Sequence, residues 1–172
     1  MDSIASTSYH QAVILLGSNL GHREAMLAQA TEQLPNRQTY LINQSNIYES
    51  EAWGFDAPNF LNQVIVLQTK MQPDDLLTHL LHIESQIGRS REPQSGYVSR
   101  IIDIDLLYYD RLIINLPHLI IPHPRLHQRR FALIPLVEVL PDFVHPVLNQ
   151  THRELVDQLQ DSGRISLFRP LP

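Results

Sequence analysis

The stretch from Arg100 to Leu107 constrains the fold more than any other part of this sequence. Apolar side chains alternate here with Asp103 and Asp105, the period-two pattern of a β-strand with one buried face. The two carboxylates would share the other face, about 6.6 Å apart. Asp is depleted from strands, so this pair indicates either a metal site or a charged, solvent-facing strand edge. A cation would offset the repulsion between the carboxylates, which favours the metal, and oxygen-only ligation favours Mg²⁺.

The bulk composition fits one folded domain. The chain has 172 residues, of which 43% are hydrophobic and 18% charged, as in globular proteins. We expect a single domain over residues 1–172, with a core from about 12 to 160. The net charge of −5 argues against a general nucleic-acid surface, and the absence of cysteine removes thiolate chemistry. No apolar run approaches the roughly 20 residues of a membrane span. We therefore expect a cytoplasmic protein that binds neither nucleic acid nor membrane.

The hydrophobic pattern predicts alternating strands and helices. Expected strands cover residues 12–16, 39–48 and 60–69, the aspartate strand through 109, and the short pieces 112–114 and 119–121; expected helices cover 23–34, 73–87, 131–139 and 151–159. Residues 17–21, Gly-Ser-Asn-Leu-Gly, lack the ending of a P-loop and are interpreted as a turn that caps the first helix. The order strand, helix, strand, strand, helix, strand predicts an α+β ferredoxin-like sandwich, with helices packed on a mostly antiparallel sheet.

Three arginines bracket the segment before the aspartate strand: Arg89, Arg91 and Arg100. Taken alone they indicate a solvated basic loop. Beside two carboxylates that hold Mg²⁺, their guanidinium groups provide what a polyphosphate chain requires. We therefore favour a phosphate-binding role.

A second segment with candidate ligands runs from residue 121 to 131 and contains His123, His127 and Arg129. Prolines flank His123 and make a helix through it unfavourable, so a zinc site shared with His127 is a weak interpretation. A neutral His123 could hydrogen-bond a phosphate or a ribose, and Arg129 could add a phosphate contact. A surface histidine without a role is an equally open alternative for His123.

Aromatic side chains and one amide gather around the expected loops. They are Trp53, Phe55, Phe60, Tyr97, Phe131 and Asn62. Most aromatic residues serve only for packing, but together these could form a flat slot for a planar heterocycle whose edge the amide recognises.

The motifs also occur in a characteristic order. They are Gly17-Ser18-Asn19-Leu20-Gly21, Phe60-Leu61-Asn62, Ile83-Glu84 with Gly88-Arg89, the Arg100 to Leu107 strand, and Ile121-Pro122-His123 leading to Arg129-Arg130-Phe131. In this order, from residue 12 to about 159, the chain resembles the 6-hydroxymethyl-7,8-dihydropterin pyrophosphokinase family. The resemblance implies transfer of the β,γ-pyrophosphoryl group of ATP to the pterin hydroxymethyl oxygen, a step in folate biosynthesis that releases AMP.

The resemblance also implies two Mg²⁺ ions and a set of site residues. Asp103 and Asp105 would hold both ions, Arg89 and Arg100 would stabilise the transfer, and Asp103 is a candidate acceptor for the hydroxyl proton. ATP would be surrounded by Glu84, Arg89, Arg91, Arg100, His123 and Arg129. The pterin would contact Ser50, Glu51, Trp53, Asn62, Tyr97 and Phe131.

Two other functions stay open from the residues alone. The carboxylates and arginines would also suit another Mg²⁺-dependent phosphoryl or nucleotidyl transferase on a similar sandwich. A ferredoxin-like RNA-binding module would present aromatic and basic residues on its sheet, although the acidic net charge counts against it. Among partners, the resemblance implies small-molecule substrates and, because such domains are fused to them in some organisms, neighbouring folate-pathway enzymes.

Overall fold

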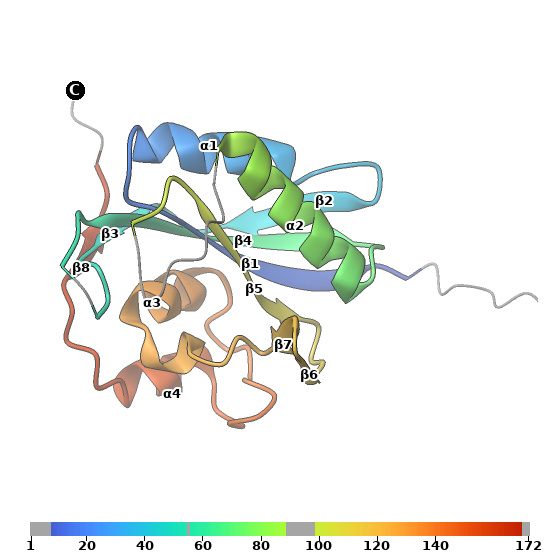
Figure 1. Ribbon diagram of the computed structural model, residues 1–172. Coiled ribbons are helices and arrows are strands. Elements are labelled where there is room, and N and C mark those ends of the chain that lie inside the picture. The colour runs from blue at the N-terminus through green and yellow to red at the C-terminus, as the bar shows by residue number, and fades with distance from the viewer. Residues whose placement is uncertain (1–7, 55, 89–98, 170–172) are drawn as a thin grey trace, which may run out of the picture.

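A computed structural model describes residues 8–54, 56–88 and 99–169, and a six-stranded antiparallel sheet dominates this part of the chain (Figure 1). The sheet strands are β1 (His10–Ser18), β2 (Thr39–Gln44), β3 (Tyr48–Ser50), β4 (Phe60–Thr69), β5 (Asp103–Tyr109) and β8 (Ile165–Leu167). A separate hairpin joins β6 (Ile114–Leu116) to β7 (Leu119–Ile121). The helices are α1 (Arg23–Gln33), α2 (Pro73–Ile87), α3 (Arg130–Val139) and α4 (His152–Asp157), with a 3₁₀ turn at Leu126–Gln128.

The strand order matches the split βαβ arrangement. Along the chain the elements run β1, α1, β2, β4, α2 and β5, with the short β3 between β2 and β4. Across the sheet the neighbours are β5, β1, β4 and then β2, all antiparallel, while β3 and β8 extend the sheet beyond another part of β4. The predicted ferredoxin-like α+β fold is confirmed.

One face of the sheet is covered by α1 and α2 (Figure 1). Alternate residues of β1 and β5 point to this side, and they include Ile14, Leu16, Ile104 and Leu106. They pack against one apolar stripe of each helix, and α2 ends at Gly88, whose φ of 105° supplies the left-handed closing residue. The expectation that Ile104 and Leu106 face the core is confirmed, which leaves Asp103 and Asp105 on the opposite face.

The opposite face is covered by α3 and α4 over part of its area (Figure 1). Val13, Leu15 and Leu107 pack there against Leu133 and Leu136 of α3. Because β1 is buried on both faces, its sequence is a continuous apolar run instead of an alternating one. Next to the start of α3 this face is open, and the candidate site lies there.

Some sequence-based boundaries were wrong. The strand expected over residues 39–48 is split into β2 and β3, because the register with β4 shifts between Leu41 and Asn43 and the Ser45 hydroxyl then accepts the Val64 N–H. The piece expected at 112–114 begins only at Ile114, since Asp110, with a φ of 47°, starts a turn that precedes the strand. The last helix ends at Asp157 instead of residue 159.

Two further features were missed. Strand β8 pairs with β3, so ordered structure continues past residue 160. The segment 17–21 does not cap α1: the N-cap residue is His22, which makes no side-chain capping bond, whereas Gly17 and Ser18 belong to β1. The Ser18 hydroxyl donates to the Ile101 carbonyl instead.

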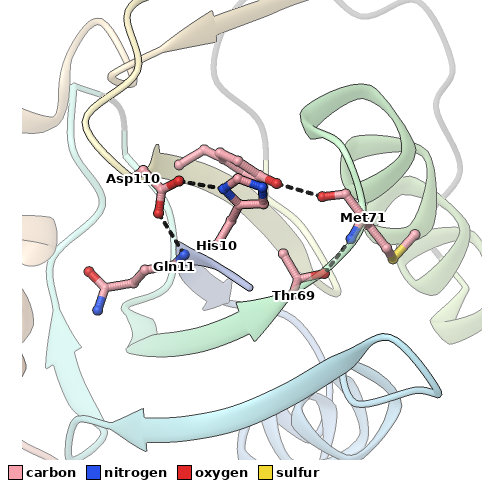
Figure 2. A network of polar contacts seen from close by, with 6 residues as sticks. His10, Gln11, Thr69, Met71 and Asp110 are labelled. Carbon is pink, nitrogen blue, oxygen red and sulfur yellow. Dashed lines mark hydrogen bonds and ion pairs between the residues drawn. The ribbon is translucent and has the colours of Figure 1, made fainter. Parts of the chain in front are cut away.

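The end of β1 and β5 remote from the site is held by a polar network (Figure 2). The Asp110 carboxylate accepts the Gln11 N–H at 2.8 Å, and its other oxygen lies 2.6 Å from Nδ1 of His10. Close by, the Thr69 hydroxyl accepts the Met71 N–H at 3.1 Å. These contacts fix β5 in register on β1.

In the part of the chain that the structure describes, none of the helices combines the length and the apolar character that crossing a bilayer requires.

Candidate active site

The centre of the site is a row of residues across three strands. Gly17 on β1 pairs with Asn62 on β4 on one side and with Asp103 on β5 on the other. A methyl group on Gly17 would lie 3.6 Å from the Asn62 amide oxygen and 3.8 Å from the Phe60 ring. The missing side chain therefore leaves space above the sheet between an amide, an aromatic ring and a carboxylate.

This space opens into a cavity of about 180 Å³ on the face that α3 leaves uncovered. Its lining residues are Leu15, Gly17, Ser50, Glu51, Trp53, Phe60, Asn62, Arg100, Asp103, Asp105, His123, Arg129 and Phe131. A second cavity, of about 370 Å³, lies between α2, β5 and the β6–β7 hairpin. The two cavities share Arg100, Asp103, Asp105 and His123 as a common wall.

Asn19 joins the segments around the entrance. Its side-chain oxygen accepts the Arg100 N–H at 2.6 Å, while its amide nitrogen donates to the Pro58 carbonyl and to the Ser99 hydroxyl, both at 3.1 Å. The Asn19 N–H in turn donates to the Arg100 carbonyl at 3.0 Å. Asn19 thus fixes Arg100 at the start of the aspartate strand.

Asp103 and Asp105 lie on one face of β5, as predicted, and both line the two cavities. Arg100 donates from a guanidinium nitrogen to Asp103. Burial, and next the negative charge of Asp103, raise the pKa of the Asp105 carboxyl above its usual range. Partial desolvation and mutual repulsion thus disfavour two ionised carboxylates here, and a divalent cation would offset both effects. The pair is therefore suited to binding such a cation.

The described residues contain no cluster of three or more histidine, aspartate or glutamate side chains suited to a metal ion. A cation at Asp103 and Asp105 would therefore take its other ligands from substrate phosphates and water. This is the usual arrangement for Mg²⁺, which is commonly held by one or two carboxylates together with phosphate oxygens. The donor set present fits Mg²⁺ on these grounds.

Glu84 lies behind the aspartate strand. It is 1% exposed, and its carboxylate accepts the N–H of Ile104, the residue between the two aspartates, at 2.8 Å. Because β5 is an edge strand, this bond satisfies a backbone donor that no further strand could take. Glu84 also borders the second cavity.

His123 and Arg129 approach the cavity from the segment before α3. Burial, and next the charge of Arg129, lower the pKa of His123 to about 4, so its imidazole is neutral at pH 7. Its Nδ1 accepts the Arg125 N–H at 3.3 Å, which places the ring proton on Nε2. His123 is therefore a neutral donor on the wall that both cavities share.

Aromatic rings and an amide form the other wall. The Arg129 side chain is almost fully buried, and its guanidinium carbon lies 5.1 Å from the Trp53 ring centre and 5.6 Å from that of Phe131. Asn62 is buried and donates to the Ser50 hydroxyl at 2.8 Å. The cavity thus offers flat apolar faces together with a buried, oriented amide.

The structure brings most of the predicted site residues together. Those at one or both cavities are Ser50, Glu51, Trp53, Asn62, Glu84, Arg100, Asp103, Asp105, His123, Arg129 and Phe131. Arg89, Arg91 and Tyr97 lie outside the described residues. Gly17 and Asn19 were missed as site residues because only the strand register and long-range bonds reveal them, and Phe60 was noted only as one of several aromatics.

The fold and the site define a class of protein: a ferredoxin-like α+β domain in which carboxylates, guanidinium groups and a neutral histidine separate an aromatic cavity from a second, more open one. Residues 13–141 match the sequence profile of the family described as 7,8-dihydro-6-hydroxymethylpterin-pyrophosphokinase. The chain belongs to this family, and the resemblance recognised in the motifs is confirmed.

Individual relatives agree with this assignment. The chain is 41% identical to the 2-amino-4-hydroxy-6-hydroxymethyldihydropteridine pyrophosphokinase of Porphyromonas gingivalis over 134 residues, 76% of this chain and 90% of that protein. It is 39% identical to the folic acid synthesis protein fol1 of Pneumocystis carinii over 149 residues, which cover 86% of this chain but 20% of that protein.

A solved structure supports the fold. Plasmodium falciparum HPPK-DHPS is similar with a TM-score of 0.72 at 18% identity, over 91% of this chain and 47% of that one. The chain thus spans less than half of that protein, and at this identity the likeness concerns the fold alone.

Proposed function

We propose that this chain transfers the β,γ-pyrophosphoryl group of ATP to the hydroxymethyl oxygen of 6-hydroxymethyl-7,8-dihydropterin, with release of AMP. The observation that carries the proposal is the wall shared by the two cavities. A transfer reaction needs a donor and an acceptor that meet at one place, and here Arg100, Asp103, Asp105 and His123 form that place. The relative in Porphyromonas gingivalis carries the corresponding name.

The aromatic cavity suits the acceptor. A pterin is planar and displays hydrogen-bonding groups along its edge, and the cavity provides the Phe131 and Phe60 rings and the buried Asn62 amide. Ser50, Glu51 and Trp53 border the same space. The second cavity, with apolar side chains from α2 and β7 and with Glu84 at its border, suits ATP.

The reaction requires little covalent chemistry from the protein itself. The hydroxymethyl oxygen forms a bond to the β-phosphorus, the bond from that phosphorus to the α,β-bridging oxygen breaks, and AMP leaves. Arg100 would neutralise charge on the phosphates, and neutral His123 and Arg129 would orient them; that all three line the acceptor cavity supports these roles. Asp103, which lines the same cavity, is the proposed acceptor of the hydroxyl proton.

Asp103 and Asp105 would hold the Mg²⁺ ions, two by analogy with the family, together with the phosphates of ATP. When bound, Mg²⁺ would supply positive charge that offsets the developing charge on the transferred group. Arg89 and Arg91 as ATP ligands, and Tyr97 as a pterin contact, remain proposals from the sequence.

The test is an analysis of the nucleotide products. The protein is incubated with ATP, Mg²⁺ and 6-hydroxymethyl-7,8-dihydropterin, with controls that lack the pterin. Pterin-dependent AMP is expected from the wild type, and none from Asp105→Ala. The matched control Asp142→Ala changes an exposed aspartate that lines neither cavity, so it should keep full activity. ADP in place of AMP would indicate a simple kinase, and no pterin-dependent product from folded protein would reject the proposal.

We also propose the wider setting of this activity. Its substrates are the two small molecules, its step belongs to folate biosynthesis in the cytoplasm, and neighbouring enzymes of that route are its candidate partners. The names folic acid synthesis protein fol1 and HPPK-DHPS, carried by much longer relatives, support this setting. The single-domain organisation stays a prediction from chain length.

A further inference from the structure

We infer that Asp161, in the segment between α4 and β8, is a positioning residue for the acceptor cavity. The inference rests on the proposed function, and it concerns a part of the chain beyond residues 13–141 that match the family. Figure 1 shows this C-terminal segment, in red, running from α4 past the start of α3 to β8 beside β3.

The start of α3 needs a capping group from elsewhere. Arg129 is the N-cap residue, and its side chain makes no capping bond. The first helical N–H, that of Arg130, donates instead to Oδ2 of Asp161 at 2.9 Å, across 31 positions of sequence. Asp161 thus supplies a charged acceptor to the positive end of a helix that has no local cap.

Asp161 is itself held in place. Its Oδ1 accepts the Gly163 N–H at 2.9 Å, so both oxygens of the carboxylate are engaged. A methyl group on Gly163 would come within 3.0 Å of that Oδ1, a distance that forces the carboxylate to shift. The position of Asp161 can therefore be disturbed without removing its charge.

The capped residue, Arg130, lies between two residues at the start of α3 whose side chains line the cavity. Arg129 and Phe131 both line the acceptor cavity, and the Arg129 guanidinium lies over the rings of Trp53 and Phe131. A smaller cleft of about 150 Å³ connects Asp161 and Phe131 to the loop at residues 50–54. Fixing the Arg130 backbone thus fixes the direction of the side chains on either side of it, those of Arg129 and Phe131.

The same segment also holds the part of the cavity lining at residues 50–51. The Glu51 N–H donates to the Arg164 carbonyl at 3.2 Å, and β8 pairs with β3 through Ser50 and Ile165. The Glu51 and Arg164 side chains also form an ion pair, but Arg164 is largely exposed and that contact is weak. The C-terminal segment therefore contacts two parts of the lining of the proposed pterin cavity, the start of α3 and residues 50–51, and Asp161 is its charged anchor.

The test compares Asp161→Ala, Asp161→Asn and Gly163→Ala with the matched control Asp157→Ala, an exposed position on α4 without a described hydrogen bond. For Asp161→Ala we expect the KM for the pterin to rise about fivefold or more, the factor that loss of an N-cap commonly costs in an equilibrium. The KM for ATP should rise less than the KM for the pterin, since no residue of the C-terminal segment lines the second cavity and Arg129 is the one affected side chain that is also proposed to contact ATP. Gly163→Ala and Asp161→Asn should give smaller shifts in the same direction.

A second readout does not depend on turnover. Trp53 is the sole tryptophan, and it lines the cavity beside Arg129. Acrylamide quenching of its fluorescence therefore reports directly how well this part of the cavity lining is ordered. Quenching should increase in Asp161→Ala and stay at the wild-type level in Asp157→Ala.

The possible outcomes separate the inference from the function. An unchanged pterin KM and unchanged quenching in Asp161→Ala would overturn the inference while the proposed function stands. A lower kcat with both KM values unchanged would mean a merely structural role and would also overturn it. If Asp161→Ala does not fold, Asp161→Asn and Gly163→Ala decide. A wild type that forms no pterin-dependent AMP would reject the function, and the quenching would still support or overturn the role of Asp161.

Discussion

Acid should destabilise this protein through His152. This side chain is 0% exposed, and its Nδ1 lies 2.6 Å from the Leu140 carbonyl oxygen, so Nδ1 carries the proton of a neutral ring. Nε2 then accepts the Tyr108 hydroxyl at 3.1 Å, and the ring stacks on Phe143. Burial lowers the pKa of His152 to about 4, a shift that the bond to Leu140 only partly offsets.

The sign and the size of the effect follow from linkage. An unfolded histidine titrates near pH 6.5, so between about pH 6.5 and 4 the unfolded chain binds a proton that the folded protein excludes. The contribution of His152 is therefore complete above pH 6.5 and is lost as the pH falls toward 4. The full loss is roughly 3 kcal/mol, and between pH 7.5 and 5.5 it is roughly 1.3 kcal/mol, against a typical total of about 5–15. His145, whose pKa burial also lowers to about 4, should add to it.

The assay is urea unfolding of wild type and His152→Gln at pH 7.5 and 5.5. Glutamine retains a donor for Leu140 and an acceptor for Tyr108 but does not titrate, so the variant should lose about 1.3 kcal/mol less than wild type over this interval. His82→Gln, at an exposed position of α2, is the control and should keep the wild-type slope. An identical loss in His152→Gln and wild type would refute the assignment of the acid sensitivity to this ring.

Two further predictions concern the site. Asp105→Asn removes one member of the half-buried carboxylate pair, so in cation-free buffer at pH 8 its Tm should exceed that of wild type, while the rise in Tm that Mg²⁺ causes should disappear; an equal Mg²⁺ effect in both proteins, measured by calorimetry, would exclude Asp105 as a ligand. Gly17→Ala adds a methyl group that meets its neighbours at ordinary distances of 3.6–4.0 Å, so the Tm should hold while pterin affinity, followed by Trp53 fluorescence, falls roughly tenfold. Unchanged affinity would mean that the pterin does not use the space above Gly17.

Local patterns were sufficient for most of the fold. The strand β4 was predicted with its observed bounds, and the alternation in β5 placed Asp103 and Asp105 on the face away from the helical core. Such features depend on side-chain periodicity within a few residues. The split between β2 and β3 depends instead on a register shift against β4 and on the Ser45 hydroxyl, neither of which a single strand pattern contains.

The site was predictable only where chemistry is local. Two carboxylates at i and i+2 can be recognised from the sequence alone, and so can an aromatic residue beside an amide. Gly17 could not be recognised in this way, because its importance comes from the strands on either side of it. Asn19 and Asp161 act through hydrogen bonds to residues 81 and 31 positions away, and only the folded chain shows these partners.

The placement of the carboxylate pair on an edge strand connects the fold to the function. β5 has one neighbouring strand, β1, so its free side can border a second cavity while its face borders the first. An edge strand leaves backbone donors without partners, and here the one between the aspartates is taken by Glu84, which brings a third carboxylate behind the pair. This concentration of negative charge opposes folding, and Arg100 offsets part of it. Contacts remote from the substrates, such as those of Asp110 with β1 at the other end of the same strands, stabilise the fold against the rest of this electrostatic cost. A stable register there lets the protein keep, at the site, a charge arrangement that only bound cations and phosphates complete.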